Sequence, residues 1–269
     1  MAVPATTEPA TTEPATISDR PSSHNDRGIE EIREVIKILK DAGIICCMVG
    51  GKTLLYYGVH RIPTDWHVCV PNDQFSNASA IFARLSDTFE PGAQIMPQIR
   101  SLIHTYPRFK QKGVNFSIFI MPAFEYFIHD LDETMIERSQ NDIPYPKLEH
   151  FAQSLVSTQR WAELAALIDG MDLEEEWGTT HLQLDMPSQA ERDYVEQKNI
   201  KYQSVQDQFP KANLRIGTLS KRPIDRTEKW KTLVKDKEKR IGLHLPKERY
   251  ATQYRRKGSQ DPRHRGRAV

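Results

Sequence analysis

Two hydrophobic periods alternate along the first half of the chain, and each change of period marks an expected element. The apolar run at 44–49 predicts a strand that is buried on both faces. The next apolar run alternates with polar residues, which is typical of a strand with two different faces. We therefore expect Trp66 and Val68 to face the core while Asp65 and His67 face the opposite way.

A pair of glycines joins these two strands. Gly50 and Gly51 allow a sharp turn and a close approach of another group to the backbone. A short helix that begins there would direct free N–H groups and the positive end of its dipole at whatever lies above the turn. Such a turn suits a phosphate group, and the charge of Lys52 directly after it could attract the same group.

The remaining periodicity predicts an α/β (α+β) protein with a small mixed sheet. Strands are expected at 99–106 and 114–120, paired as a hairpin across a polar turn. Helical periodicity predicts helices at about 28–42, 74–86 and 147–170, the last with a break near 157–158, then a shorter acidic segment from 174 and an exposed helix within 185–210.

Composition divides the chain into four parts. Residues 1–27 repeat Thr-Thr-Glu-Pro-Ala without large hydrophobic residues, which predicts a disordered acidic head. Residues 28–143 form the expected core, and 144–210 form a helical layer that follows the boundary Pro-Tyr-Pro. Residues 211–269 form a basic tail, which we expect to be largely extended or disordered.

The charge of the tail opposes that of the body. Residues 211–269 carry 19 Lys and Arg against 6 Asp and Glu, a net charge of +13, while the other residues carry 18 against 30, a net charge of −12. Three interpretations stay open: a solvated tail, an arm for nuclear localisation or nucleic-acid contact, and docking onto the acidic body.

Composition also bears on the compartment. No apolar run approaches the ~20 residues that span a membrane, and the N-terminus lacks the pattern of a secretory signal. Cys46 and Cys47 are adjacent in one expected strand and therefore point to opposite faces, and Cys69 lies in the other. We expect three buried free thiols and an intracellular protein, cytoplasmic or nuclear, without a membrane partner.

The motif formed by Gly50-Gly51, thirteen intervening residues and then Asp65-x-His67 resembles the signature of the polymerase-beta-type nucleotidyltransferase fold. The resemblance covers about residues 30–125 and extends to uncharacterised fungal members. In that family the glycine pair holds a nucleotide triphosphate, and two carboxylates on the next strand bind divalent metal together with a third from a later strand.

The resemblance therefore implies nucleotide binding at Gly50, Gly51 and Lys52. It implies metal binding at Asp65, with Mg²⁺ as the cofactor, and catalysis by Asp65 and His67.

The chain departs from that family at two of the three acidic positions. His67 stands where the second carboxylate belongs, and the expected strand 114–120 offers Asn115 and Ser117 as ligand contacts but no acid. Two-metal catalysis requires anionic oxygen ligands that hold the ions about 3.5–4 Å apart. One carboxylate, one imidazole and one amide fit that requirement poorly.

Three functions follow from this pattern. The first is a divergent, catalytically impaired nucleotidyltransferase-like protein that binds a nucleotide or another phosphate ligand at the Gly-Gly turn. The second is an active, metal-dependent transferase of nucleoside monophosphate to an unknown acceptor. The third is a scaffold whose basic tail, residues 211–269, contacts nucleic acid.

Overall fold

The computed structural model describes residues 19–60, 65–208, 217–241, 246–250 and 255–264. The strands are β1 (Cys47–Val49), β2 (Trp66–Val70), β3 (Phe89–Pro91), β4 (Arg108–Gln111), β5 (Ser117–Pro122), β6 (Ile136–Arg138) and β7 (Pro144–Pro146). The α-helices are α1 (Ser23–Asp26), α2 (Ile29–Asp41), α3 (Gly51–Tyr56), α4 (Phe75–Arg84), α5 (Leu148–Ser157), α6 (Trp161–Met171), α7 (Glu175–His181), α8 (Gln189–Gln208) and α9 (Arg226–Lys235). Short 3₁₀ helices are η1 (Ile103–Thr105), η2 (Ala123–Tyr126), η3 (Glu133–Met135), η4 (Glu238–Arg240) and η5 (Pro262–His264).

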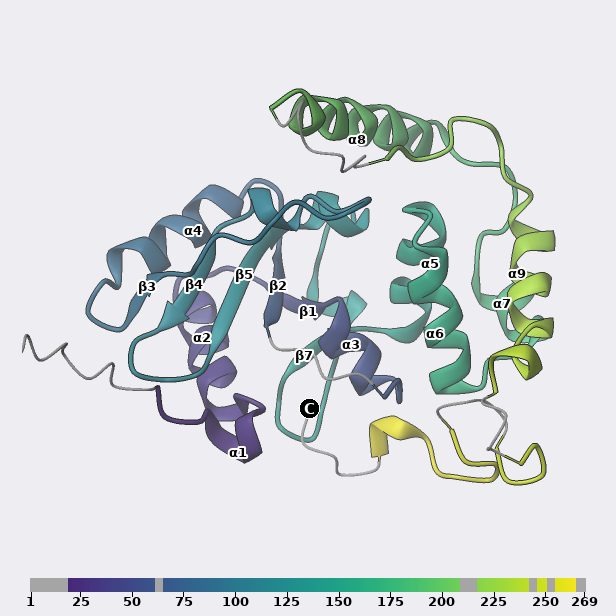
Figure 1. Ribbon diagram of the computed structural model, residues 1–269, viewed down its shortest axis with the longest axis horizontal. Coiled ribbons are helices and arrows are strands. Elements are labelled where there is room, and N and C mark those ends of the chain that lie inside the picture. Colours follow the sequence, from purple (N-terminus) through teal and green to yellow (C-terminus); the bar gives the residue numbers. More distant parts are fainter. Residues whose placement is uncertain (1–18, 61–64, 209–216, 242–245, 251–254, 265–269) are drawn as a thin grey trace, which may run out of the picture.

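A five-stranded mixed sheet forms the centre of the molecule (Figure 1). Its strand order is β1-β2-β5-β4-β3, with β2 parallel to β5 and every other neighbouring pair antiparallel. Strands β6 and β7 pair separately as an antiparallel ribbon. The predicted α+β class with a small mixed sheet is thus confirmed.

The strand register sorts side chains onto two faces of the sheet. Trp66 pairs with Ile118, and both are fully buried on the apolar face. His67 pairs with Val49 on one side and with Phe119 on the other, so these three residues share the opposite face. The predicted alternation of Trp66 and His67 therefore holds.

Helices cover the apolar face from two directions. Phe82 of α4 makes edge and tilted ring contacts with Phe89 and Phe109, at 5.3 and 5.7 Å between centroids. Just before α2, the carbonyl oxygen of Arg27 accepts a hydrogen bond from the indole nitrogen of Trp66 at 3.0 Å. These contacts seal the sheet with large aromatic side chains, which contribute much of the buried area.

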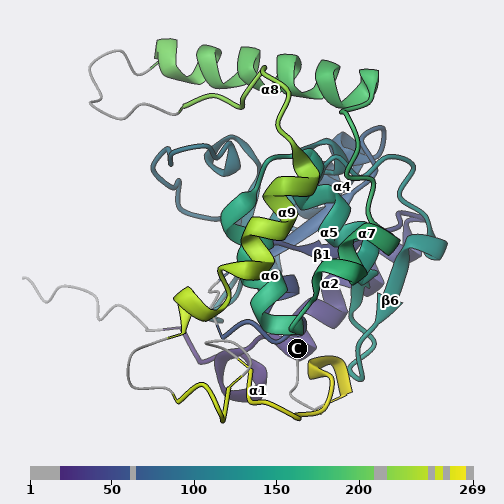
Figure 2. The ribbon, with the colours of Figure 1, turned by 90° about the vertical axis from the view of Figure 1, so that its right-hand side faces the viewer.

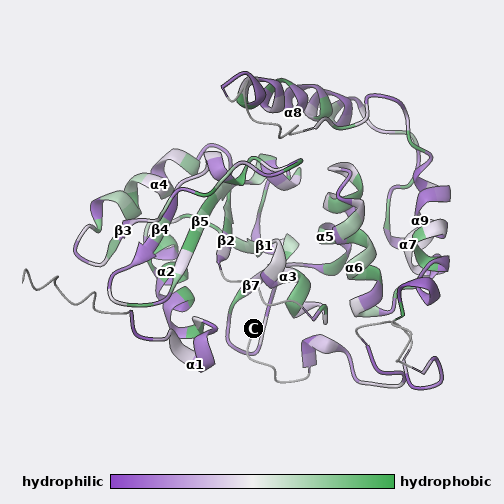
Figure 3. Ribbon diagram, in the orientation of Figure 1, coloured by the Kyte–Doolittle hydropathy of each residue, from purple (hydrophilic) through white to green (hydrophobic). Residues whose placement is uncertain are grey.

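A helical layer stands beside the end of the sheet formed by β1. Phe151 of α5 packs its ring against Tyr57 and Tyr126, and α9 lies outside α6 with its Trp230 buried (Figures 1 and 2). Helix α8 crosses one end of the molecule and is mostly hydrophilic, whereas the central strands β2 and β5 are mostly hydrophobic (Figure 3). Among the helices of the described residues, none is both long and apolar enough to span a bilayer.

Several predicted elements match the observed ones closely. The alternating run forms β2, the break near 157–158 separates α5 from α6, and the long helix is α8. Helix α8 is not exposed on all sides as expected, because Tyr194 and Tyr202 bury one of its faces. Helix α2 ends before Gly43, whose φ of 72° fits the left-handed position expected there. Its N-cap is Gly28 and not Asp26, because the Asp26 carboxylate instead accepts from the backbone N–H of Ser22.

The strand predicted at 99–106 is wrong. That stretch contains η1, and the strand that pairs with β5 is β4, within the segment expected to be a turn. The apolar residues near 102 misled the prediction, since Leu102 packs in a small second cluster with Tyr194 and Tyr202 of α8. Pairing with β5 and not local composition makes β4 a strand.

Both chain ends partly pack on the body. The backbone of Arg20 bonds to Gly113 and Asn115, so 19–27 is placed against the turn before β5, although it was expected to belong to the disordered head. Residues 1–18 of that head lie outside the described residues. In the basic stretch, α9 is a helix that the sequence did not predict.

We expect Gly178→Ala to destabilise the contact between α7 and α9. A Cβ at this helical glycine would lie 2.0 Å from the Trp230 ring, which is itself buried and cannot retreat freely. Overpacking of this kind costs about 1–3 kcal/mol, which chemical denaturation would detect as a lower free energy of unfolding. The exposed Thr180→Ala on the same helix is the control, and equal stability of both variants would contradict the predicted clash.

Candidate functional site

The Gly50 turn touches the polar face of β2 directly. Gly50 has φ 70° and ψ −137°, a conformation that strongly favours glycine. A Cβ there would lie 2.7 Å from Nδ1 of His67 and 3.1 Å from the hydroxyl of Tyr126. Gly51 begins α3, and no side chain caps the N–H groups of that helix. The glycine turn therefore lies beside the second strand, as expected.

Lys52 is buried and directed away from His67. Its ammonium group donates to the carbonyl of Arg27 at 3.3 Å and lies 4.4 Å from the centroid of the Trp66 ring. Trp66 and His67 point to opposite faces of β2, so the Lys52 amine lies on the Trp66 side. Burial, and next the charge of Arg27, lower the pKa of Lys52 to about 8. Its assignment to nucleotide binding stays a prediction.

Asp65 is held by an arginine that the sequence did not single out. Its carboxylate accepts a hydrogen bond from Nη2 of Arg108 at 2.8 Å, and both side chains are about four-fifths buried. The guanidinium of Arg108 also lies 5.6 Å from the ring of Phe119, which occupies the third strand opposite His67. The only predicted metal-binding acid is thus already neutralised.

His67 is half-buried at the centre of the site. Its Nδ1 is buried and makes no hydrogen bond within the described structure, and its ring meets Phe119 edge-on at 5.5 Å. Burial lowers the pKa of His67 to about 4, although the carboxylates of Asp65 and Glu163 oppose this shift. The imidazole is therefore neutral at pH 7, with an unsatisfied nitrogen beside Gly50.

The two further predicted contacts lie in different places. Ser117 begins β5 on the same face as Phe119 and is half-buried. Asn115 precedes the strand and is exposed, and its amide donates to the carboxylate of Asp26 at 2.8 Å. The structure therefore brings Ser117 to the face of Asp65 and His67, but it ties Asn115 to the N-terminal segment.

A buried ionic cluster adjoins this face. Glu125 is 1% exposed and binds Arg160 at 2.6 Å, the hydroxyl of Tyr106 at 2.5 Å, and the ammonium of Lys198. Burial alone would raise the pKa of Glu125, but Lys198 and Arg160 outweigh it and hold the pKa below its usual range. Arg160 also lies 4.3 Å from the ring of Tyr126, the neighbour of Gly50.

None of the nearby acids completes a metal site with Asp65. Glu125 is neutralised by its two cations, Glu163 pairs with Arg160 at 3.0 Å, and Asp132 caps η3 through bonds to Thr134 and Met135. Among the described residues no group of three or more His, Cys, Asp or Glu side chains could hold a metal ion. The donors present therefore do not fit the Mg²⁺ that the resemblance implies.

Sequence reasoning missed Arg108, Tyr126 and Arg160 at this site. Arg108 could have been found only if β4 had been predicted, since its pairing with Phe119 places it on the polar face. Arg160 follows the break between α5 and α6, and nothing in the local pattern shows that it turns toward Glu125. All three acquire their place from contacts between segments far apart in the chain.

Comparisons with known proteins add little to this geometry. The sequence matches no protein-family model and no curated protein. One similar solved structure is ANT(2'')-Ia in complex with adenylyl-2''-tobramycin, with 11% identity, a TM-score of 0.36, and coverage of 56% of this chain and 92% of that one. Another is JHP933 from Helicobacter pylori, with 12% identity, a TM-score of 0.34, and coverage of 80% and 92%.

A third similar structure is a protein of H. pylori provisionally classed as a nucleotidyltransferase. It has 12% identity and a TM-score of 0.35, and the match covers 79% of this chain and 94% of that one. Superpositions as loose as these three do not establish that the folds are the same.

We predict that His67 makes the protein less stable in acid. In the unfolded chain His67 becomes protonated below about pH 6.5, whereas in the folded protein it stays neutral down to about pH 4. The free energy of unfolding therefore decreases as the pH drops between those two values. The loss is on the order of 2–3 kcal/mol, measurable by urea denaturation at pH 7 and pH 4. His67→Asn should flatten this pH dependence.

The exposed His24, which pairs with Glu30 at 3.3 Å, provides the matched control. His24→Asn should leave the slope between pH 7 and pH 4 unchanged. An NMR titration in which the His67 ring protonates near pH 6.5 would contradict the predicted burial effect.

Proposed function

We propose that this chain is a divergent, catalytically impaired nucleotidyltransferase-like protein that binds a phosphate-bearing ligand of the nucleotide class at the Gly50-Gly51 turn. The observation that carries the proposal is the Asp65–Arg108 ion pair beside that turn, at 2.8 Å. This ion pair leaves the N–H groups of the turn available to bind an anion. It also engages the carboxylate of Asp65, which metal-dependent catalysis would need as a ligand.

The residues around Asp65 support the loss of metal chemistry. The next polar-face position on β2 is the neutral His67, and β5 supplies Ser117 and Phe119 in place of an acid. Hard Mg²⁺ ions require oxygen ligands, and a pair of them requires several carboxylates. A metal-dependent transfer through this set of side chains is therefore not favoured.

The turn itself supports anion binding. The first N–H groups of α3 have no side-chain cap, and the Nδ1 of His67 is buried without a partner next to Gly50. A buried polar atom without a hydrogen bond costs about 1–3 kcal/mol, which a ligand could recover. A phosphate oxygen would accept hydrogen bonds from these N–H groups and from the Nδ1–H tautomer of His67.

The other two functions receive less support. An active transferase would need acidic ligands, which the described residues near Asp65 do not supply. In the basic stretch, Lys237 pairs with Asp172 and Arg240 donates two hydrogen bonds to Asp169. These pairs favour docking of the described part of the tail onto the body. Nucleic-acid contact by 211–269 and kinship with fungal members stay predictions.

The proposal predicts ATP binding that ignores metal. Isothermal titration calorimetry in Mg²⁺ and in EDTA should give dissociation constants within roughly threefold of each other, because no metal bridges the phosphates to the protein. Asp65→Asn should weaken binding in neither condition, because it removes a negative charge that is paired with Arg108 and holds no metal. Metal-dependent affinity that Asp65→Asn abolishes would contradict the impaired site, as would transfer of α-labelled nucleotide to an acceptor in a cell extract.

A pair of glycine variants tests the location of the ligand. Gly50→Ala should abolish ATP binding, because the new Cβ would displace His67 from the turn. Gly43→Ala is the control, since Gly43 has a similar positive φ of 72° but nothing within 4 Å of its added Cβ. Equal affinity of both variants, or no binding of ATP by the unaltered protein, would reject the turn as a phosphate site.

A further inference from the structure

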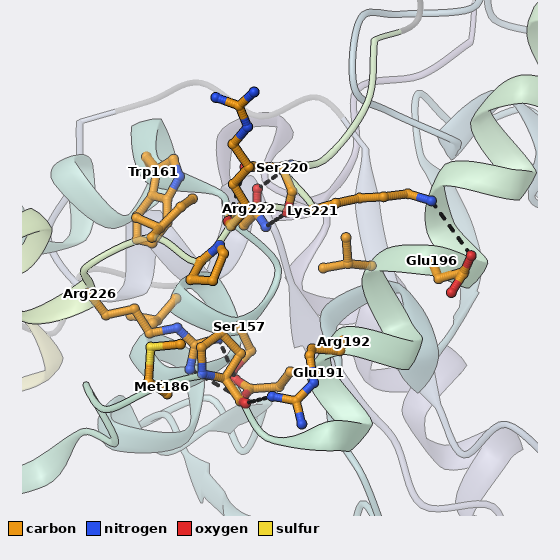
Figure 4. A pocket seen from close by; sticks show the side chains of 16 residues that line it. Ser157, Trp161, Met186, Glu191, Arg192, Glu196, Ser220, Lys221, Arg222 and Arg226 are labelled. Carbon is orange, nitrogen blue, oxygen red and sulfur yellow. Dashed lines mark hydrogen bonds and ion pairs between the residues drawn. The ribbon is translucent and has the colours of Figure 1, made fainter.

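A second cavity lies away from the Gly50 turn, where the end of α5 and the start of α6 meet the first half of α8 and residues 220–226 (Figure 4). Its volume is about 210 Å³. This is smaller than the ~300–1,000 Å³ of pockets for drug-sized ligands, so it suits a body of about two fused rings.

The outer wall of this cavity is fixed before any ligand arrives. The side-chain amide of Asn199 bonds to both the N–H and the C=O of Leu219, and the amide of Gln159 does the same to Ser220. Each pair reproduces the two hydrogen bonds of a strand neighbour. A preformed wall avoids the entropic cost of ordering a loop upon binding.

The floor of the cavity is polar but fully satisfied. Glu191 accepts hydrogen bonds from Ser157 at 2.6 Å, from Arg226 at 3.2 Å and from the backbone N–H of Ser188 at 2.7 Å. Arg226 and Glu191 are both buried, and their charges cancel. A ligand therefore does not need a charged group to compensate the floor, and its contact with the apolar walls can dominate binding.

Apolar side chains supply those walls. Trp161 is half-buried at the start of α6, and it lines the cavity together with Val195 of α8 and Ile224 of the outer segment. An indole ring beside aliphatic side chains favours a flat apolar guest.

The rim carries positive charge that the protein does not neutralise. Among the described residues, Arg192 donates to neutral acceptors alone, the side-chain oxygen of Gln189 and the carbonyl of Pro187. The guanidinium of Arg222 makes no hydrogen bond or ion pair within the described ranges, and it extends outward from the rim (Figure 4).

The other rim cation is already paired. Lys221 forms an exposed ion pair with Glu196 at 3.5 Å, so these two charges offset each other. The rim therefore retains two unopposed guanidinium groups, and guanidinium groups bind carboxylates and phosphates well.

We propose that this cavity binds a small amphipathic anion, consisting of a flat apolar body of about two rings and one carboxylate or phosphate. The apolar body packs between Trp161, Val195 and Ile224, and the acidic group pairs with Arg192 and Arg222 at the rim. This site is separate from the Gly50 turn and does not rest on the proposed function there.

Three matched naphthyl compounds test the proposal by chemical-shift titration of the full chain. Naphthylacetate and naphthyl phosphate should shift the amide signals of Val195 and Ile224 and the indole signal of Trp161 saturably. Naphthylmethylamine, which carries the opposite charge, should bind at least about tenfold more weakly. The tighter of the two anions identifies the acidic group.

Two variants locate the binding. The double variant Arg192→Gln/Arg222→Gln should weaken both anions by roughly fivefold to tenfold, and Ile224→Trp should abolish binding by filling the cavity. Arg33→Gln on α2 removes another exposed arginine, far from the cavity in sequence, and should change nothing. The proposal is overturned if the amine binds as tightly as the anions, if no shifts occur at the cavity, or if affinity survives Ile224→Trp in a folded variant.

Discussion

The buried carboxylate of Glu125 is the constraint on which the arrangement of the outer elements depends. It lies on η2, directly after the central strand β5, and receives Tyr106 from beside η1, Arg160 from the start of α6 and Lys198 from α8. A buried ion without its partners costs several kcal/mol, so these elements can dock in only a few ways that keep the charge paired. The cluster therefore sets where α6 and α8 stand relative to the sheet.

The connection between α5 and α6 transmits this constraint to both candidate sites. Arg160 turns inward to Glu125 and lies over Tyr126, whose hydroxyl is next to Gly50. The residues on either side of it, Gln159 and Trp161, line the separate cavity beside α8. Arg160 thus helps to position one wall of the Gly50 site and one wall of the cavity beside α8. The two sites are connected through this residue, although each is proposed to bind its own ligand.

Charge on the polar face of the sheet has been balanced within the protein. Asp65 is paired with Arg108, and burial keeps His67 neutral at pH 7. Where the carboxylates are already paired with arginine, as Asp65 and Glu163 are, the face is better suited to donating hydrogen bonds to an anion than to binding Mg²⁺. Charges of the basic stretch are also paired with acidic residues of the body, since Arg240 forms an ion pair with Asp169 and Arg263 forms one with Glu137.

The sequence by itself determined the elements whose signal is local: the alternation of β2, the break between α5 and α6, and a glycine turn beside a polar strand face. Hydrophobic period and backbone freedom are properties of neighbouring residues, so they can be read from the chain alone. Only the tertiary structure decided that β4 is a strand, that Arg108 takes Asp65, and that Lys52 turns toward Trp66. Those outcomes depend on which distant segments meet, and the energy of a charge depends on its partners and burial, which no local pattern encodes.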